Sequence, residues 1–562
     1  MSARRLAALA ALVAALSAPG TAALAQDSPD ADPIFRAMHD EMERAKTLSM
    51  PKVEKPYWLS AYVNDGDSFS CSASFGSLTD QGGGHSASLS TNIRVGAPDL
   101  DQTNFSGDFS FFSSGFGGGG PVEPDYDALR QALWLSFDGE YKGATEAIAK
   151  KRAWLTANNV KDRQPDFGPA KLTEVLQPHA TLTVDKAKWE ATVRKVSAAF
   201  RDFPGVYRCN AGMAASVSNQ YFMSTDPVRH RFAYGHASFT LSCSTQAADG
   251  MPLSLSWTAE GHRVEDLPPE GALIEAARGL AKRLDDLAKA PAAEDYWGPV
   301  LFTGKAAARF FLETVGGPLS NPRQDLGDSQ GGRLVDRLGR RIAARFLVAR
   351  DDPGQAEWKG QPLLGGYPVD DDGVLPQAIT LIDAGVLRTY YMSRVPTKLV
   401  AATNGHARAG KGSTANLFIE GKETHPRAEL EKRLLAMCAE EDLEYGMVIE
   451  ELGGGGGSGG SFFRFGGGDS GELELPPPSI AWRLYRDGRR ELVRGATFKG
   501  APYRILKDLA ALGDDPTLLH ANHNGQQVSV VAPSVLVEEM ELRRPKEEFQ
   551  KPPYSERPKL GE

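Results

Sequence analysis

The sequence predicts a two-domain α+β protein, because its 562 residues exceed one ordinary core and because helical and strand patterns occur in separate blocks. The hydrophobic fraction of 41% and the charged fraction of 24% are typical of a globular protein. The net charge of -9 provides no basic surface of the kind that binds nucleic acid. We therefore expect no nucleic acid among its partners.

The first 25 residues have the features of a secretory signal peptide. Arg4 and Arg5 precede an apolar stretch at 6–16, and Ala23-Leu24-Ala25 fits a cleavage site. The apolar stretch is shorter than the roughly 20 residues that a membrane-spanning helix needs, and no later stretch approaches that length. We expect cleavage after Ala25 and a periplasmic or secreted protein without an integral membrane segment. An uncleaved anchor helix is the alternative.

The chain contains four cysteines, which allow three complete pairings. Cys209 and Cys243 lie in neighbouring strand-like segments, so this pair is the first choice for a disulfide. Free buried thiols remain the alternative, since Cys is often buried without pairing.

Residues 26–290 are predicted to form a mixed helical and antiparallel-sheet domain. Apolar residues at helical spacing predict helices at 33–46, 126–141, 143–158 and 271–289. Alternating polar and apolar residues, separated by Asp-Gly and Gly-rich turns, predict strands at 59–63, 68–75, 87–95, 206–213, 220–223, 231–243 and 253–257.

Residues 291–545 are predicted to form a second, strand-rich domain. It begins with an apolar strand at 299–302 and a helix at 306–315, has an acidic amphipathic helix at 429–444, and closes with a strand at 526–531. Residues 453–468 are mostly glycine, a composition that predicts a flexible surface insertion. A phosphate-binding loop is not indicated, because no Lys-Ser/Thr pair is present. Residues 546–562 form a polar tail.

The stretch PVLFTGKAAARFFLETVGG at 299–317 resembles the TldD/PmbA family of metallopeptidase-related proteins. In that family a similar strand and helix start lead into His-Glu-x-x-x-His, whose histidines ligate zinc and whose glutamate is the expected general base. Here Leu312 and Gly317 occupy the two histidine positions, and only Glu313 remains. The resemblance implies a residual general-base position at Glu313 without the metal that would activate water.

Other blocks extend this resemblance over residues 297–545. They are the acidic turn with two strands at 368–394, the turn at 404–408, and the strand at 524–530. In zinc-bearing members the third ligand is a cysteine before a later strand, and that position falls on Pro478. All three expected zinc ligands are therefore absent, and we expect no bound cofactor.

Other groups in the sequence also have side chains that can bind metal ions. His520 with His523, and His230 with His236, are spaced for metal binding but lack a fitting Cys or carboxylate set, which favours ordinary core or surface roles. Asp370-Asp371-Asp372 is either a hard-cation site or, as the missing calcium-loop spacing favours, an acidic turn. Trp297 and Trp482 are expected in the core.

Three functions are compatible with these observations. The first is a zinc-free subunit that pairs with a zinc-bearing TldD-type paralogue and helps to form a chamber for unfolded peptides, held by strand-edge pairing. The second is an active metallopeptidase with an unrecognised metal site. The third is a binding or assembly factor of the cell envelope without proteolytic function. The resemblance favours the first.

Overall fold

The computed structural model describes residues 32–51, 53–106, 123, 125–320, 323, 325–327, 334–453, 472–502, 504–544, 549–550 and 558. The predicted signal peptide, the glycine-rich stretch at 454–471 and most of the polar tail lie outside these residues. The described chain combines helices with mainly antiparallel sheets, which confirms the α+β class. No helix in these ranges is long and apolar enough to cross a membrane.

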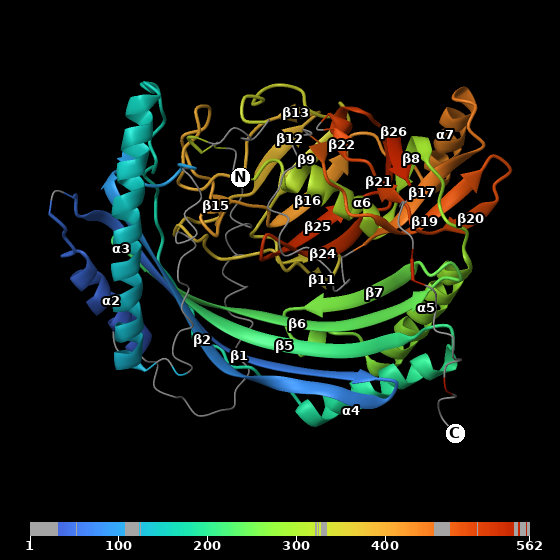
Figure 1. The fold of residues 1–562 in the computed structure, drawn as a ribbon, viewed down its shortest axis with the longest axis horizontal. Helices are drawn as coiled ribbons and strands as arrows, with labels where there is room; N and C mark the ends of the chain where they lie inside the picture. The colour runs from blue at the N-terminus through green and yellow to red at the C-terminus, as the bar shows by residue number, and fades with distance from the viewer. Residues whose placement is uncertain are drawn as a thin grey trace, which may run out of the picture.

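The N-terminal part is built on one curved sheet (Figure 1) with the order β3-β2-β1-β5-β6-β4, in which β7 also pairs with β6. Its strands are β1 (Pro56–Ser74), β2 (Ser77–Ala97), β3 (Leu100–Asp101), β4 (Val175–Leu176), β5 (Arg208–Ser224), β6 (Arg229–Gln246) and β7 (Pro252–Gly261). Figure 1 shows β7 as the strand of this sheet that lies nearest to the C-terminal part.

The long strands are longer than the sequence predicted. The expected turn at Asp65-Gly66 is absent, and β1 continues through it because β2 pairs on one side and β5 on the other. A Cβ at Gly66 would lie 2.6 Å from the carbonyl oxygen of Val217, so this glycine permits close approach of β5. The predicted strands at 206–213 and 220–223 likewise form one continuous strand.

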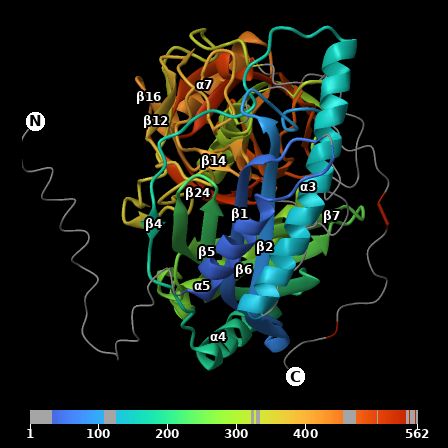
Figure 2. The same ribbon diagram turned by 90° about the vertical axis from the view of Figure 1, so that its left-hand side faces the viewer.

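Helices cover one face of this sheet. They are α2 (Pro33–Ala45), α3 (Tyr126–Ala157), α4 (Lys186–Ala198) and α5 (Glu270–Lys289), with short turns η1 (Ala199–Asp202) and η2 (Val264–Asp266). Figure 1 shows α2 and α3 at one end of the sheet, and Figure 2, viewed from that end, shows α3 in front of the strands. In β1 the odd-numbered residues 59–63 pack with α2 and α3, and 69–73 pack with α4 and α5. The even-numbered face is left for the C-terminal part.

The two helices predicted at 126–141 and 143–158 form the single helix α3. Gly139 and Gly143 interrupt the helical pattern at a cost of about 1 kcal/mol each relative to Ala. A Cβ at either position would have no neighbour within 4 Å. Buried residues Leu133, Tyr141 and Ile148 on the opposite face keep the helix continuous through these glycines.

The C-terminal part has two main sheets, ordered β13-β12-β9-β16-β25-β24 and β20-β19-β17-β8-β26-β21, with β23 also paired to β26. The first contains β9 (Leu347–Asp351), β12 (Ile379–Asp383), β13 (Val386–Leu387), β16 (Asn416–Gly421), β24 (Thr517–His523) and β25 (Gln526–Ala532). The second contains β8 (Tyr296–Phe302), β17 (Tyr445–Leu452), β19 (Pro478–Tyr485), β20 (Arg490–Val493), β21 (Thr497–Phe498), β23 (Leu509–Leu512) and β26 (Val535–Arg543).

Small hairpins and three helical segments complete this part. The hairpin strands are β10 (Glu357–Trp358), β11 (Gln361–Pro362), β14 (Ala407–Arg408), β15 (Lys411–Gly412), β18 (Glu472–Leu473) and β22 (Ala501–Pro502). The helical segments are α6 (Gly304–Phe311), which continues into the π-helical turn η3 (Leu312–Gly316), α7 (Arg427–Glu440) and η4 (Ile505–Lys507). Helix α6 contacts β17, β24 and β25, so it lies between the two sheets.

Two sequence expectations in this part are wrong. Trp297 is 60% exposed rather than in the core. Its neighbours in β8, Tyr296 and Gly298, are buried, and the side chain between them points to the opposite, exposed face of the strand. The strand at 526–531 is not the last one, since β26 follows and pairs antiparallel with β8. The two strands predicted after the acidic turn are present as β12 and β13, joined by a hairpin turn in which Ala384 and Gly385 both have positive φ.

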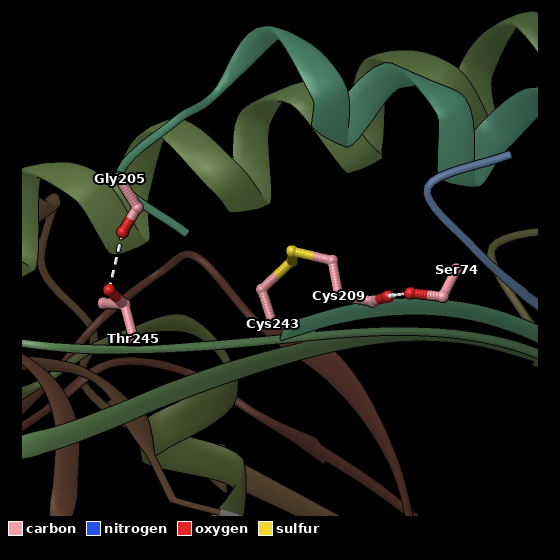
Figure 3. Close-up of a disulfide and its surroundings, with 5 residues drawn as sticks. All are labelled: Ser74, Gly205, Cys209, Cys243 and Thr245. Carbon is pink, nitrogen blue, oxygen red and sulfur yellow. Dashed lines mark hydrogen bonds between the residues drawn. A yellow bond between two sulfur atoms is a disulfide. The ribbon is translucent and has the colours of Figure 1, made fainter. Parts of the chain in front are cut away.

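Cys209 and Cys243 are joined by a disulfide between directly paired residues of β5 and β6. Both side chains are buried on the face that α4 and α5 cover (Figure 3). Nearby, the hydroxyl of Ser74 donates to the carbonyl of Cys209, and the hydroxyl of Thr245 donates to the carbonyl of Gly205, each at 2.6 Å. Cys71 and Cys438 are free and buried.

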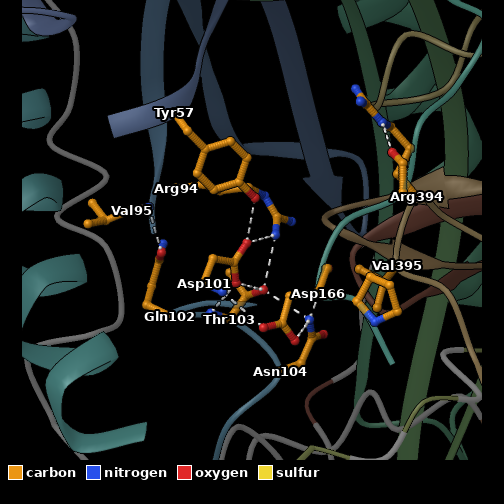
Figure 4. Close-up of polar contacts among 12 residues, drawn as sticks. Tyr57, Arg94, Val95, Asp101, Gln102, Thr103, Asn104, Asp166, Arg394 and Val395 are labelled. Atoms are coloured by element: carbon orange, nitrogen blue, oxygen red, sulfur yellow. Dashed lines mark hydrogen bonds and ion pairs between the residues drawn. The ribbon is translucent and has the colours of Figure 1, made fainter. Parts of the chain in front are cut away.

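A buried ionic network connects the two parts, and Figure 4 shows Arg94, Asp101 and Asp166 within it. The Asp166 carboxylate lies 2.6 Å from the Lys151 ammonium of α3 and 2.8 Å from the Arg323 guanidinium of the C-terminal part. Asp101 pairs with Arg94 at 2.7 Å and donates its backbone N–H to Asp166. These side chains are at least nine-tenths buried, so each charge depends on its partners for solvation.

Candidate functional site

The first vacated ligand position lies inside the apolar core. Leu312 has no exposed surface and packs with residues such as Phe311 and Leu381 in the main cluster of the C-terminal part. The N–H of Gly317 donates to the carbonyl of Leu312 at 2.9 Å, which closes the π-helical turn. A hydrocarbon side chain in this environment provides no metal ligand.

The second vacated position is bordered by a histidine from another element. A Cβ at Gly317 would lie 3.7 Å from Cε1 and 3.9 Å from Nε2 of His523, at the end of β24. Burial lowers the pKa of His523, and the negative charge of Glu313 partly offsets this effect. His523 therefore occupies space beside the turn, in its neutral form at neutral pH.

Glu313 is paired with a cation from its own helix. Its carboxylate lies 2.7 Å from the guanidinium of Arg309, four residues earlier, and the Glu313 side chain is only 19% exposed. The arginine supplies a permanent positive charge at the carboxylate. The local chemistry is that of a helix-surface ion pair and not of a base beside a metal-bound water.

The third vacated position also lacks a donor. Pro478 is the first residue of β19 and lies opposite Leu452 of β17. Within the described ranges, no group of three or more His, Cys, Asp or Glu residues is placed to hold a metal ion. The residues at Leu312, Gly317 and Pro478 do not fit zinc.

The other histidines considered as metal ligands differ in their direct contacts, although His236 and His520 both lie near enough to Glu260 to lower its pKa. His236 lies 3.2 Å from the Glu260 carboxylate, and Nδ1 of His520 lies 3.0 Å from the Ser529 hydroxyl. His230 is 1% exposed, is stacked on Phe222 with ring centroids 5.5 Å apart, and accepts from the N–H of Val175. Burial lowers the pKa of His230 and of His520 to about 4.

We expect His230→Gln to reduce acid destabilisation of the fold. A histidine whose folded pKa is about 4 stays neutral in the fold, whereas the unfolded chain binds a proton below about pH 6.5. His230 therefore costs the fold no stability above about pH 6.5. As the pH falls from about 6.5 towards about 4, the unfolded chain binds a proton that the fold does not, and the free energy of unfolding decreases. We expect the free energy of unfolding, measured by urea denaturation at several pH values in this range, to depend less steeply on pH in the variant. The difference in slope should correspond to about one bound proton. An equal slope in His230→Gln and wild type would contradict this, and exposed His39→Gln serves as control.

The acidic turn at 370–372 uses its carboxylates for backbone hydrogen bonds. Asp370 accepts from the N–H groups of Asp372, Val374 and Ala407 at 2.8–3.0 Å. Asp371 accepts from the N–H of Ala409, and Asp372 accepts from the N–H of Arg394. This arrangement supports the acidic-turn interpretation, since the oxygens that a cation would need already organise the loop.

A cavity of about 1220 Å³ lies between the N-terminal sheet and the C-terminal part. On one side it is lined by the even-numbered residues 238–244 of β6 and by residues 254–260 of β7. On the other side it is lined by Lys305 and Arg309 of α6, His520 of β24 and residues at the end of β17. The cavity therefore reaches the helix that carries Glu313.

Strand β7 borders this cavity with its edge. Seven consecutive residues, 254–260, contribute to the lining, so both faces of the strand contribute rather than one. One side of β7 pairs with β6, and no described strand pairs with its other side. Unpaired strand edges are templates for extended chains.

The sequence analysis missed these lining residues. Hydroxyl side chains recur at every second position in 238–244 and in 254–258. Such a period of two places them on one strand face, and the pattern was a usable signal for a polar surface. The sequence alone does not show that α6 and β24 face these hydroxyl groups across the cavity.

Comparisons with known proteins agree with this architecture. Residues 295–544 match the family model described as the PmbA/TldA metallopeptidase C-terminal domain. The fold resembles a "putative modulator of a DNA gyrase" from Thermotoga maritima, with 16% identity and a TM-score of 0.57 over 86% of this chain and 96% of that one. No curated protein matches the sequence.

Two further solved structures have the same fold. One is a "putative modulator of DNA gyrase" from Bacteroides thetaiotaomicron, with 12% identity and a TM-score of 0.57 over 92% of this chain and all of that one. The other is TldE from Thermococcus kodakarensis, with 12% identity and a TM-score of 0.54 over 91% of this chain and all of that one. At these identities the likeness concerns the fold.

Proposed function

We propose that the chain, whose residues 295–544 match the PmbA/TldA metallopeptidase C-terminal domain, is an exported, zinc-free subunit of a peptide-processing chamber. The Arg309–Glu313 ion pair carries the proposal. It engages the one remaining residue of the zinc motif with a guanidinium, in a helix whose two histidine positions are Leu and Gly.

The cavity supports the chamber part of the proposal. Its volume of about 1220 Å³ is larger than that of most small-molecule sites, which measure about 300–1,000 Å³. The open edge of β7 offers main-chain donors and acceptors, which bind extended chains with little dependence on side chains. An unfolded peptide is therefore the ligand class that the cavity fits best.

The remaining parts rest on the sequence. The pattern at 1–25 supports export, and the Cys209–Cys243 disulfide suits an oxidising compartment outside the cytoplasm. The family resemblance supports a zinc-bearing TldD-type paralogue as partner, because a subunit without ligands needs another chain to supply the chemistry.

We expect the purified, tag-free mature chain to retain far less than one zinc per chain after incubation with zinc and desalting. None of the three positions offers a ligand atom, so nothing holds the ion. The chain alone should not hydrolyse unfolded peptides, and Glu313→Ala should leave both results unchanged. Stoichiometric zinc together with hydrolysis that Glu313→Ala abolishes would instead establish an active metallopeptidase.

The partner is tested by purification from the native envelope fraction. A zinc-bearing paralogue should copurify with the chain, and the complex should hydrolyse unfolded peptides when neither chain alone does so. Isolation of the chain by itself, together with unchanged peptidase activity of the paralogue after removal of this chain, would refute the paired-subunit function. That result would favour an envelope assembly factor.

A further inference from the structure

The carboxylates that line the cavity already have partners. Glu451 lies 2.7 Å from the guanidinium of Arg283, and Glu260 lies 3.2 Å from the ring of His236. Asp266 accepts two backbone N–H groups at 3.0 Å each. Each of these carboxylates therefore already has a hydrogen-bond or ion-pair partner.

Two of the lining cations differ in this respect. Arg309 is paired with Glu313, but Lys305 and Arg208 form no ion pair within the described part of the chain. Both side chains are exposed to the cavity that they line. Because the whole chain carries a net charge of -9, these two charges do not belong to a generally basic surface.

Between these two cations the floor is a regular grid of hydroxyl groups. Strand register places four rows across β5, β6 and β7: Arg208 with Ser244 and Ser254, Asn210 with Ser242 and Ser256, Gly212 with Thr240 and Thr258, and Ala214 with Ser238 and Glu260. The alternate residues of β5 and β6, such as Cys209 and Leu241, face the helices instead. Seven of the twelve positions in these rows carry a hydroxyl group, and each row contains at least one.

The two cations mark opposite ends of this grid. Arg208 is in the first row, and the positive charge of Lys305 is among the causes that hold down the pKa of Glu260 in the last row, against the raising effect of burial. From Ser254 to Glu260 the floor measures about 20 Å along β7, at about 3.3 Å per residue. An extended segment of about six residues spans this length.

We propose that the cavity selects extended polypeptide segments that carry carboxylate groups, which Lys305 and Arg208 bind at the two ends of the hydroxyl grid. This inference rests on the proposed function and adds a charge preference to it. Hydroxyl groups and cations both donate to carboxylates, and charge-assisted hydrogen bonds are stronger than neutral ones. The carboxylates come from Asp and Glu side chains or from the carboxyl terminus.

The test measures binding of dye-labelled peptides to the full mature chain by fluorescence anisotropy. Peptides of about ten residues rich in Ser and Gly carry either Glu or Gln at matched positions, with a free or an amidated carboxyl terminus. The variants are Lys305→Gln, Arg208→Gln and the double variant. Lys282→Gln, which removes an exposed helical cation outside the cavity, is the matched control. Thermal melts establish that each variant is folded.

We expect Glu peptides to bind at least about tenfold more tightly than Gln peptides, in keeping with one or more charge-assisted hydrogen bonds. The double variant should remove this preference by lowering the affinity for Glu peptides to about that for amidated Gln peptides, whereas Lys282→Gln should leave the preference as it is. A smaller effect of amidation than of Glu→Gln replacement identifies side chains as the source of the carboxylates, and a larger one identifies the terminus.

Equal binding of all four peptides, with Glu or Gln and with a free or an amidated terminus, would overturn the charge preference while leaving the chamber function standing. Persistence of the preference in the double variant would overturn the assignment to Lys305 and Arg208. Failure of every peptide to bind, at low and high salt, would refute the proposed function itself. The two proposals therefore fail in distinguishable ways.

Discussion

Replacing Asp166 by alanine is expected to lower the free energy of unfolding by about 3–5 kcal/mol, because the change leaves two buried cations without their shared anion. The Lys151 ammonium is fully buried and lies 2.6 Å from this carboxylate, and Arg323 lies 2.8 Å from its other oxygen. Asp166 also accepts the backbone N–H of Asp101. Urea denaturation and thermal melts of the full chain measure the loss.

Two comparisons make this prediction specific to the network. Lys151→Met should cost less than Asp166→Ala, since Arg323 still pairs with the remaining carboxylate. Asp138→Ala breaks an ion pair with Lys142 that is largely exposed on the same helix, and it should cost about 0.5 kcal/mol or less. Equal effects of Asp138→Ala and Asp166→Ala would show that the buried network does not stabilise the fold as described.

Removing the disulfide by the double change Cys209→Ala and Cys243→Ala is expected to cost about 2–4 kcal/mol. The bond closes a loop between residues 34 positions apart, and without it the unfolded chain gains conformational freedom. The two strands keep their pairing in the fold, so the loss should appear as lower stability and not as a different structure. Melting curves with and without reductant measure it.

The Cys209→Ala, Cys243→Ala variant also serves as the control for effects of the reductant other than cleavage of this disulfide. Dithiothreitol should lower the stability of the wild-type chain to about that of the variant and leave the variant unchanged, since Cys71 and Cys438 are free in both. A wild-type protein whose melting curve does not respond to reductant under denaturing conditions would contradict the assignment of this disulfide.

Much of the fold was predictable because local patterns were consistent with their tertiary surroundings. The helix at 33–46 was found as α2 almost to the residue, since Ile34, Met38 and Met42 form one buried face. The errors occur where tertiary contacts override local signals. Asp65-Gly66 is a strong turn signal, yet pairing on both sides holds it within a strand.

The candidate site was predictable in what it lacks and not in what replaces it. The motif located Leu312, Glu313 and Gly317 on one helical segment, and α6 with η3 places them there. That His523 borders Gly317 depends on the position of β24, which is about 200 residues away in the sequence. Long-range packing of this kind leaves no local pattern in a single sequence.

The alternation of β6 between a helix-facing side and a cavity-facing side has a consequence for how this protein can change in evolution. Inserting or deleting one residue within 229–246 would turn every later side chain of the strand to the opposite face. Ser242 would then enter the apolar core, and Leu241 would line the cavity. Length changes in this strand are therefore tolerated only when a bulge absorbs them, while substitutions at Ser238, Thr240, Ser242 and Ser244, which line the cavity, can alter ligand preference without disturbing the core.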